Sequence, residues 1–313
     1  MTATNAGGTV AEQVEGRRRY LLDREGLLGP LLLLPAVVYL LALVGFPLLM
    51  AILYAFTDIT TGHPVLHFVG LGTFRDVLAD GVFRSSLRNT VVFTLASQVL
   101  VVVLATVLAF ALRNDFKGKW FARFLILLPW TTPIALGTIA WLWMLDSLFS
   151  PIDWVLSHVG LLQQGGHMYW LGKQDLAMGS VVAVQTWRML PLATVILLAG
   201  LSSIPQEIKE AAEMDGAGFW RRLLHIEIPL LLPITGVAVL FGIVFTFTDM
   251  TVVYVLTGGG PQNSTQVLAS WAFYRGINGG SLGQGAAVAV FMFPVLAGLA
   301  ALILRLAQRA EVS

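Results

Sequence analysis

The chain has 313 residues, of which 57% are hydrophobic and only 12% are charged. Because soluble domains carry about 25% charged residues, this composition excludes an ordinary water-soluble protein and indicates one that lies in a lipid bilayer. The net charge of +1 argues against a nucleic-acid-binding surface. The lack of cysteine excludes a disulfide framework and a thiolate metal site.

Six apolar segments are long enough to cross the bilayer as helices, which takes roughly 20 residues each. The first segment is too long for the apolar region of a signal peptide and is not followed by a small-residue cleavage site, so we expect it to be retained. The predicted fold class is therefore all-α, a polytopic helical membrane protein. The predicted spans are 31–56, 89–112, 124–145, 176–201, 230–256 and 282–306.

Lys and Arg residues are concentrated in four of the segments that flank these spans. Short cytoplasmic segments near spans accumulate such residues, so we place both termini in the cytoplasm. Residues 1–30 are then a cytoplasmic segment, 31–306 the transmembrane domain and 307–313 a cytoplasmic tail. The basic residues of the four segments are Arg17, Arg18, Arg19, Arg24, Arg113, Lys117, Lys119, Arg123, Lys209, Arg221, Arg222, Arg305 and Arg309.

The cytoplasmic connection at about 202–229 has the pattern of a helical hairpin. Pro205 suits the first turn of a helix, and acidic residues follow near the positive end of that helix. Gly216 then interrupts the pattern. We expect a first helix, a glycine turn and a second short helix that ends at Pro229. On this pattern alone, the hairpin could simply cap the bundle on its cytoplasmic side.

The residues of this connection are more specific than its helical pattern. They resemble the EAA loop of ABC importer permeases, in which Glu-Ala-Ala, a glycine four positions after the second alanine, and an Ile-x-Leu-Pro ending recur. Ile228 stands where leucine is usual. The resemblance implies a coupling helix that seats in a cleft of a partner ATPase. The string that carries the resemblance contains Glu210, Ala211, Ala212, Asp215, Gly216, Ala217, Ile226 and Pro229, besides the departing Ile228.

The residue types of this loop suit the implied role. Small side chains at Ala211, Ala212 and Gly216 let another surface approach the backbone closely. The carboxylates of Glu210 and Asp215 can pair with basic groups on that surface. We therefore expect these five residues to contact the ATPase.

A second string follows the fifth predicted span. The run 258–261, Gly-Gly-Gly-Pro, lacks the Gly-Lys-Ser/Thr of a phosphate-binding loop and lies on the outer side, so it indicates a turn. With Thr257, it resembles the Thr-x-Gly-Gly-Pro element of carbohydrate-importer permeases, specifically the first permease subunit of maltose and glycerol-3-phosphate importers. Matches at 68–71 and 127–129 extend this resemblance over nearly the whole chain beyond about residue 30. Unlike the first maltose subunit, the chain has no large outer insertion and six predicted spans rather than eight.

Two charged residues fall inside predicted spans, where a central charge costs roughly 2.5 to 3.5 kcal/mol on insertion scales. Arg188 is near the middle of the fourth span, and Asp249 is in the outer half of the fifth. Because these spans run in opposite directions, the two residues lie at similar depth and could pair, and Gln185 shares the helix face of Arg188. Two interpretations stay open: an ion pair that only holds the bundle together, or a pair that gates or contacts a polar ligand.

The resemblance to the maltose permease also implies where a sugar lies. Sugars are bound by polar side chains at their hydroxyls and by aromatic faces against their CH surfaces. Gln185 replaces an asparagine of that family member, while Arg188 and Asp249 bring charges where it is neutral. The implied substrate contacts are Trp130, Gln185, Arg188, Met189, Leu192, Gly242, Phe245 and Asp249.

We therefore expect a permease subunit of an ATP-driven importer for a sugar or related polyol, in the bacterial plasma membrane. The resemblance implies a second homologous permease, two copies of a cytoplasmic ATPase that binds ATP and Mg, and an extracytoplasmic substrate-binding protein, besides lipid. We expect no ATPase and no cofactor in this chain, and its five scattered histidines lack metal-ligand spacing.

Two alternatives to a sugar importer stay open. A phosphorylated polyol such as glycerol 3-phosphate would favour a free Arg188. An ion-coupled secondary transporter could use Asp249, but the EAA-like loop would then have no role. A membrane enzyme lacks its parts, because no HExxH, GxSxG or paired-carboxylate arrangement falls within a span.

Overall fold

The computed structural model describes residues 25–163 and 165–312. Most of the predicted N-terminal segment 1–30 lies outside the described residues. The chain divides into two compact units, Met1–Met50 and Ala51–Ser313. In the described ranges, the regular structure is helical apart from one isolated bridge between Thr57 and Phe68, which confirms the all-α fold class.

The first unit contains α1 (Glu25–Leu40), η2 (Leu41–Gly45) and the beginning of α2 (Phe46–Ala55). The apolar helix Gly29–Ala55, with a mean hydropathy of 2.6, is long enough to cross a membrane and agrees with the first predicted span. η2 is one wide turn, in which the Phe46 amide donates to the Leu41 carbonyl. It directly precedes Pro47, whose ring and missing N–H disturb a regular α-turn.

The second unit opens with α3 (Gly72–Ala79) and α4 (Gly81–Arg113), which contains the second predicted span. Asp80 caps the start of α4, because its Oδ1 accepts a hydrogen bond from the Val82 amide at 2.8 Å. Helix α4 begins before the predicted boundary at residue 89, since its polar first turns stay helical beyond the apolar stretch. It therefore carries the chain through the whole second span to the connection that starts at residue 114.

The third predicted span, 124–145, is wrong as a single straight helix. It consists of α5 (Lys119–Thr131) and α6 (Ile134–Met144), whose axes are bent by 101°. Pro133 causes the break, because the residue before a proline is driven out of the helical region, and Thr132 has φ −76° and ψ 132°. The described residues thus hold five helices long enough to cross a membrane, or six when this bent pair counts as one span.

The connection after α6 folds around one buried carboxylate. It contains α7 (Pro151–His158), which Ser150 caps through a hydrogen bond from the Asp153 amide at 3.2 Å. The side chain of Asp153 accepts hydrogen bonds from the Met168 amide at 2.9 Å and from Nε1 of Trp170 at 2.8 Å. These bonds close the loop before α8 begins.

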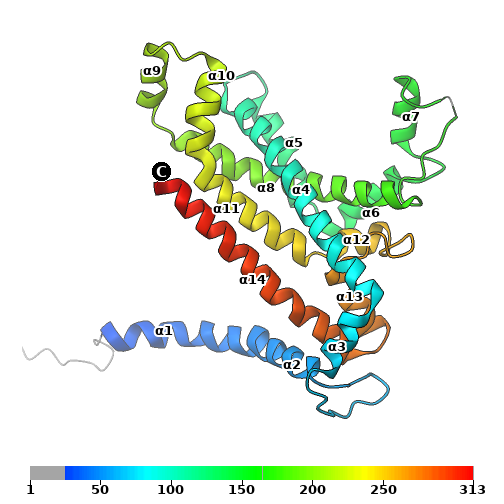
Figure 1. Ribbon diagram of the computed structural model, residues 1–313. Coiled ribbons are helices and arrows are strands. Elements are labelled where there is room, and N and C mark those ends of the chain that lie inside the picture. Colours follow the sequence, from blue (N-terminus) through cyan, green and yellow to red (C-terminus); the bar gives the residue numbers. More distant parts are fainter. Residues whose placement is uncertain (1–24, 164, 313) are drawn as a thin grey trace, which may run out of the picture. The chain divides into compact units, whose positions relative to one another are not determined.

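The fourth span, α8 (Gln174–Ser203), is the centre of the second unit. Figure 1 shows α8 with α4, α11 (Ile228–Thr248) and α14 (Leu282–Val312); α4 packs along α8, α11 contacts both, and α14 packs on α11. Small residues on α4 let α8 approach closely, and their apolar contacts form one buried cluster. This cluster contains Val101, Ala105, Ala109, Met189, Ala193, Leu197, Leu201, Ile204 and Leu231.

The predicted hairpin between spans four and five is present, with one correction. α9 (Gln206–Met214) ends in a turn at Gly216, whose φ of +74° favours glycine. The second helix does not end at Pro229, because α10 (Phe219–Arg222), η3 (Leu223–Glu227) and α11 form one continuous helix from Phe219 to Thr248. In η3 the Ile228 amide bonds the Leu223 carbonyl, and this wide turn accommodates the proline that follows.

The fifth predicted span, 230–256, is also not one helix. α11 ends at Thr248, and the short α12 (Thr251–Leu256) follows. The chain then passes through the glycine-rich loop to α13 (Leu268–Phe273) and η4 (Tyr274–Asn278) before it enters α14. Gly285 of α14 lies so close to Gly276 of η4 that a Cβ would overlap its backbone, which is why small residues are needed at this contact.

Candidate functional site

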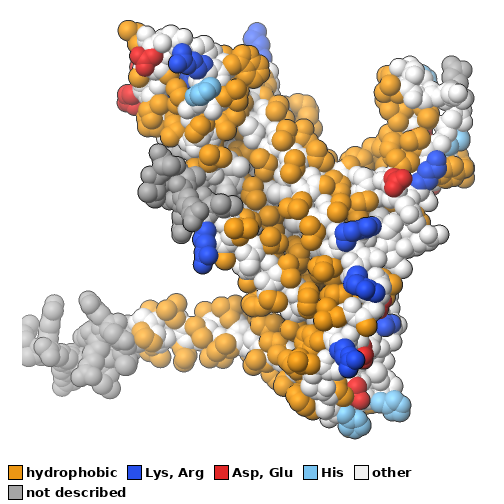
Figure 2. All heavy atoms as spheres, in the orientation of Figure 1, with side chains coloured by type: hydrophobic (Ala, Val, Ile, Leu, Met, Phe, Trp, Pro, Cys, Tyr) orange, Lys and Arg blue, Asp and Glu red, His pale blue; other side chains and the backbone are white. Residues whose placement is uncertain are grey.

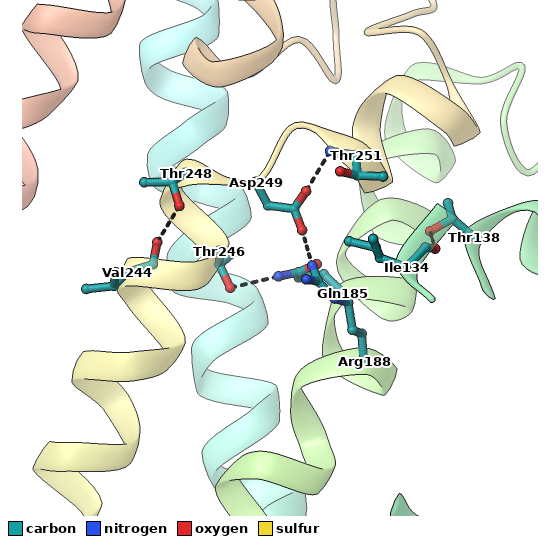
Figure 3. A network of polar contacts seen from close by, with 9 residues as sticks. All are labelled: Ile134, Thr138, Gln185, Arg188, Val244, Thr246, Thr248, Asp249 and Thr251. Atoms are coloured by element: carbon teal, nitrogen blue, oxygen red, sulfur yellow. Dashed lines mark hydrogen bonds and ion pairs between the residues drawn. The ribbon is translucent and has the colours of Figure 1, made fainter. Parts of the chain in front are cut away.

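Arg188 and Asp249 form an ion pair, in which Arg188 Nη1 donates to Asp249 Oδ2 (Figure 3). Arg188 lies on α8, and Asp249 directly follows α11. The side chain of Asp249 is 6% exposed and that of Arg188 is 23% exposed. Pairing lowers the cost of holding both charges away from water. The prediction that these two residues can pair is confirmed.

Asp249 also marks the point where span five breaks. Its backbone is extended, with φ −78° and ψ 126°, so α11 ends one residue earlier. Its Oδ1 accepts a hydrogen bond from the Thr251 amide at 2.6 Å, in the first turn of α12 (Figure 3). One carboxylate therefore serves two partners, because one oxygen binds Arg188 and the other holds the next helix.

Gln185 joins α8 to α11 one turn before Arg188. It is fully buried, and its Nε2 donates to Thr246 Oγ1 at 3.0 Å (Figure 3). Gly242, one turn before Thr246, lies against Gln98 of α4, and a Cβ at residue 242 would overlap the amide of Gln98. In the described part of the chain, Gln98 Nε2 and Gln185 Oε1 are buried without a hydrogen-bond partner. Buried polar groups therefore lie where α4, α8 and α11 meet. Leaving their amides unpaired is costly.

Two exposed aromatic rings lie near the ends of α5 and α11. The ring centroids of Trp130, at the end of α5, and Phe245, on α11, are 6.0 Å apart with planes at 73°. Each residue is 40% exposed, and Phe241 stacks on Phe245 from the preceding turn. Phe245 directly precedes the buried Thr246 in the chain, but neighbouring residues of a helix point in different directions. The exposed aromatic faces can hold the CH surface of a ring.

The other predicted substrate residues lie in different surroundings. Met189 is only 2% exposed and belongs to the apolar cluster between α4 and α8. Gly242 is buried in the contact between α11 and α4, where it serves close packing. Leu192, about one turn beyond Met189, is partly exposed. The predicted set therefore divides into a polar network, an exposed aromatic pair and residues of the helix packing.

Two polar residues of this region, Gln98 and Thr246, were not among the predicted site residues. Gln98 is an amide within the apolar second span, which is itself a signal. Thr246 lies three residues before Asp249 and so on the same side of the helix. Threonine is a weak signal, because its hydroxyl can bond its own helix backbone.

The predicted coupling residues are gathered in the α9 hairpin. Glu210, Ala211, Asp215 and Gly216 are exposed, and a Cβ at Gly216 would meet open space. Ala212 is only 6% exposed and faces the interior of the hairpin instead. In Figure 2, charged side chains gather over α9 and α10, whereas hydrophobic side chains dominate the surface of the long helices. The hairpin therefore offers an accessible surface on which small and charged residues lie beside exposed apolar ones such as Met214 and Trp220.

The family model of the binding-protein-dependent transport system inner membrane component matches residues 101–312. The chain belongs to this family. It is 32% identical over 270 residues to the trehalose/maltose transport system permease protein MalF of Thermococcus litoralis, covering 86% of this chain and 90% of that protein. It is 29% identical over 301 residues to the diacetylchitobiose uptake system permease protein DasB of Streptomyces coelicolor, covering 95% and 92%.

A solved structure supports the same fold. A chain of a bacterial ABC transporter involved in the import of the acidic polysaccharide alginate superimposes with a TM-score of 0.78 at 18% identity, covering 92% of this chain and 97% of that one. The helical membrane fold is therefore that of the family. Both the bent third span and the hairpin before span five belong to the matched residues 101–312.

Proposed function

We propose that this chain is the transmembrane permease subunit of an ATP-driven importer for a neutral sugar or oligosaccharide. The observation that carries the proposal is the α9 hairpin, which joins spans four and five and exposes Glu210, Ala211, Asp215 and Gly216. A permease that is driven by ATP hydrolysis in a partner subunit needs an accessible surface that is attached rigidly to its spans. Here the attachment is covalent and helical, because α10, η3 and α11 are continuous.

Family membership supports a proposal about the partners. The family is defined by transport that depends on a binding protein, and a solved relative is a bacterial alginate ABC transporter in complex with an alginate pentasaccharide-bound periplasmic protein. We propose a substrate-binding protein on the outer side and two copies of an ATPase on the cytoplasmic side of the bacterial inner membrane. A second homologous permease would complete the pathway, with the two permeases rocking against one another when ATP binds.

The proposed substrate contacts are the exposed aromatic pair and the neighbouring polar network. Trp130 and Phe245 would stack on the CH faces of a sugar ring, as exposed aromatic rings do in carbohydrate sites. The polar ligand would be the partly exposed Arg188 of the Arg188–Asp249 pair, while the fully buried Gln185 holds α8 to α11 one turn away. The permeases DasB and MalF, which this chain resembles, are named for uptake of diacetylchitobiose and of trehalose or maltose.

A neutral substrate fits this site better than a phosphorylated one. Arg188 is paired with Asp249, and Asp249 also holds the first turn of α12. A phosphate would have to take Arg188 from that carboxylate and leave Asp249 unpaired, which is costly for a side chain with 6% exposure. The pairing of Asp249 with Arg188 also argues against an ion-coupled transporter, because the carboxylate that would bind a proton or sodium ion already binds a guanidinium group.

The test is ATP hydrolysis and uptake by the chain purified with its partners in lipid vesicles. A panel of neutral sugars and their phosphorylated analogues would be added with candidate binding proteins. We expect one liganded binding protein to stimulate ATP hydrolysis and to deliver a neutral sugar. Stimulation by a phosphorylated compound would favour the polyol phosphate instead. Uptake that a proton or sodium gradient drives without ATP would overturn the proposal.

A further inference from the structure

A series of alternating charges connects α9 with the cytoplasmic end of α4. Glu213 of α9 pairs with Nη1 of Arg222 in α10, and Nε of Arg222 lies 3.8 Å from Oε1 of Glu227. Glu227 ends η3, and its Oε1 accepts a hydrogen bond at 2.8 Å from Nη1 of Arg113, the last residue of α4. The series therefore links the hairpin, the start of span five and the end of span two, which are far apart in the sequence.

Glu227 is the most enclosed member of the series. Its side chain is 3% exposed, against 25% for Arg113, 22% for Arg222 and 61% for Glu213. A buried carboxylate is tolerated when cations surround it, and Glu227 has two arginines beside it. It does not lie on the exposed surface of α9, so direct contact with a partner is not its role.

Lys209 of α9 adds a third positive charge to this region. It is buried, with 8% exposure, and its pKa is lowered chiefly by that burial and next by the charge of Arg113, whereas the charge of Glu227 acts in the opposite direction. Arg222 repels Lys209 as well. Without the carboxylate of Glu227, three cations from α4, α9 and α10 would therefore face one another.

The wide turn η3 explains why Glu227 is enclosed. Regular α-helical spacing would conflict with Pro229, and η3 inserts an extra residue into the helix directly before it. Glu227 occupies the variable position of the Ile-x-Leu-Pro ending, so the sequence pattern assigns it no role. The structure nevertheless gives it contacts with two other elements.

We propose that Glu227 is a positioning residue that makes the α9 hairpin move together with the cytoplasmic ends of spans two and five. This inference rests on the proposed coupling of α9 to an ATPase. Glu227 resists separation from Arg113 and Arg222, because a buried charge that loses its partner is strongly disfavoured. Displacement of α9 is thereby passed to α4 as well as to α11. Without Glu227, the like charges of Arg113 and Arg222 push the hairpin away from α4.

The experiment compares Glu227→Gln with wild type in the complete transporter, reconstituted with its ATPase, second permease and binding protein. ATP hydrolysis and sugar uptake are measured in the same vesicles. We expect basal hydrolysis to persist while the number of sugar molecules imported per ATP falls about tenfold, a typical size for coupling between distant sites. The matched control is Asp115→Asn, which removes an exposed carboxylate paired with Lys119 in the same cytoplasmic region and should change neither quantity.

A second variant separates coupling from folding. Glu227→Gln keeps an oxygen that can accept from Arg113 but removes the negative charge between Arg113 and Arg222, so the transporter could fail to assemble. Adding Arg113→Gln removes both charges, and the double variant should assemble while uptake per ATP stays low. The inference is wrong if Glu227→Gln keeps the wild-type ratio, if uptake and hydrolysis fall in equal proportion, or if the double variant regains coupling. Wild-type uptake that needs no ATP would instead refute the proposed function, and this inference with it.

Discussion

Buried charges are the residues of this chain whose replacement should have the largest effects. Arg188, Asp249 and Glu227 are held by partners from other helices. Removing one member of a buried pair costs about 3–5 kcal/mol, whereas removing both can be nearly neutral. Single and double variants therefore separate a structural role from a functional one.

The first prediction concerns the two interpretations of the Arg188–Asp249 pair. Asp249→Asn should lower the stability of the chain by about 3 kcal/mol, at the lower end for a buried pair because Arg188 is 23% exposed. Arg188→Gln combined with Asp249→Asn should recover most of that stability, as thermal unfolding in detergent would measure.

Sugar uptake by the variant that combines Arg188→Gln with Asp249→Asn distinguishes the two interpretations of the pair. If the pair contacts substrate or gates the pathway, sugar uptake should stay low although stability returns. Recovery of wild-type uptake would mean that the pair only holds α8 and the end of α11 together. The structural and functional interpretations thus differ in a single transport assay.

The second prediction concerns Lys209, whose pKa is lowered by burial and by Arg113. The folded protein binds this proton less readily than the unfolded chain does, so the contribution of Lys209 to stability improves as pH rises from neutrality toward its ordinary pKa. Lys209→Met should therefore raise the unfolding temperature at pH 7 by a few degrees. The difference from wild type should shrink at pH 9 to 10, and a difference independent of pH would contradict this account.

Interruptions of the helices are the main feature at the scale of elements. Pro133 bends the third span, Asp249 ends α11, and wide turns precede Pro47 and Pro229. Each interruption has a local cause, namely a missing N–H or a side chain that bonds the backbone. Two of them, at Pro133 and Asp249, lie next to the aromatic pair and the ion pair. The breaks therefore shape the candidate substrate site.

The third prediction tests how α11 packs on α4. Gly242→Ala should destabilise the chain by about 1–3 kcal/mol, because the new methyl group displaces the amide of Gln98, which is buried and has little room to move. Adding Gln98→Ala should relieve the overlap and restore the unfolding temperature. The control is Gly298→Ala in α14, where a Cβ meets open space and helix propensity should make the change neutral or slightly stabilising. Equal effects at the two glycines would refute the proposed contact.

Orientation in the membrane belongs to the whole molecule, and the chain is well suited to a test because it has no cysteine. Single variants Asp215→Cys in the hairpin and His63→Cys in the first outer loop both change exposed residues. In intact cells, a membrane-impermeant thiol reagent should label His63→Cys and not Asp215→Cys. Labelling should reverse in inside-out vesicles. The opposite pattern would contradict cytoplasmic termini and a cytoplasmic ATPase.

Much of the architecture could be predicted from the order of apolar, small and charged residues along the chain. Long apolar runs must form helices in lipid, because every backbone polar group needs a partner there, and this determined the all-α class and the approximate positions of the spans. The Glu-Ala-Ala string and the turn at Gly216 identified the family and its hairpin. The Arg188–Asp249 pair was predictable because two isolated charges at similar depth in neighbouring spans have few other partners.

Only the tertiary structure decided which residues meet across helices. The chain breaks at Pro133 and at Asp249 but continues as a helix through Pro229, so neither hydropathy nor the presence of a proline could show where the spans are interrupted. Met189 and Gly242 lie buried in the packing of α8 and α11 on α4, because close contact with α4 determines how these helices are rotated. Glu227 lies in the wide turn η3, where it contacts Arg113. The sequence pattern does not predict a wide turn at this position, so it could not predict this contact.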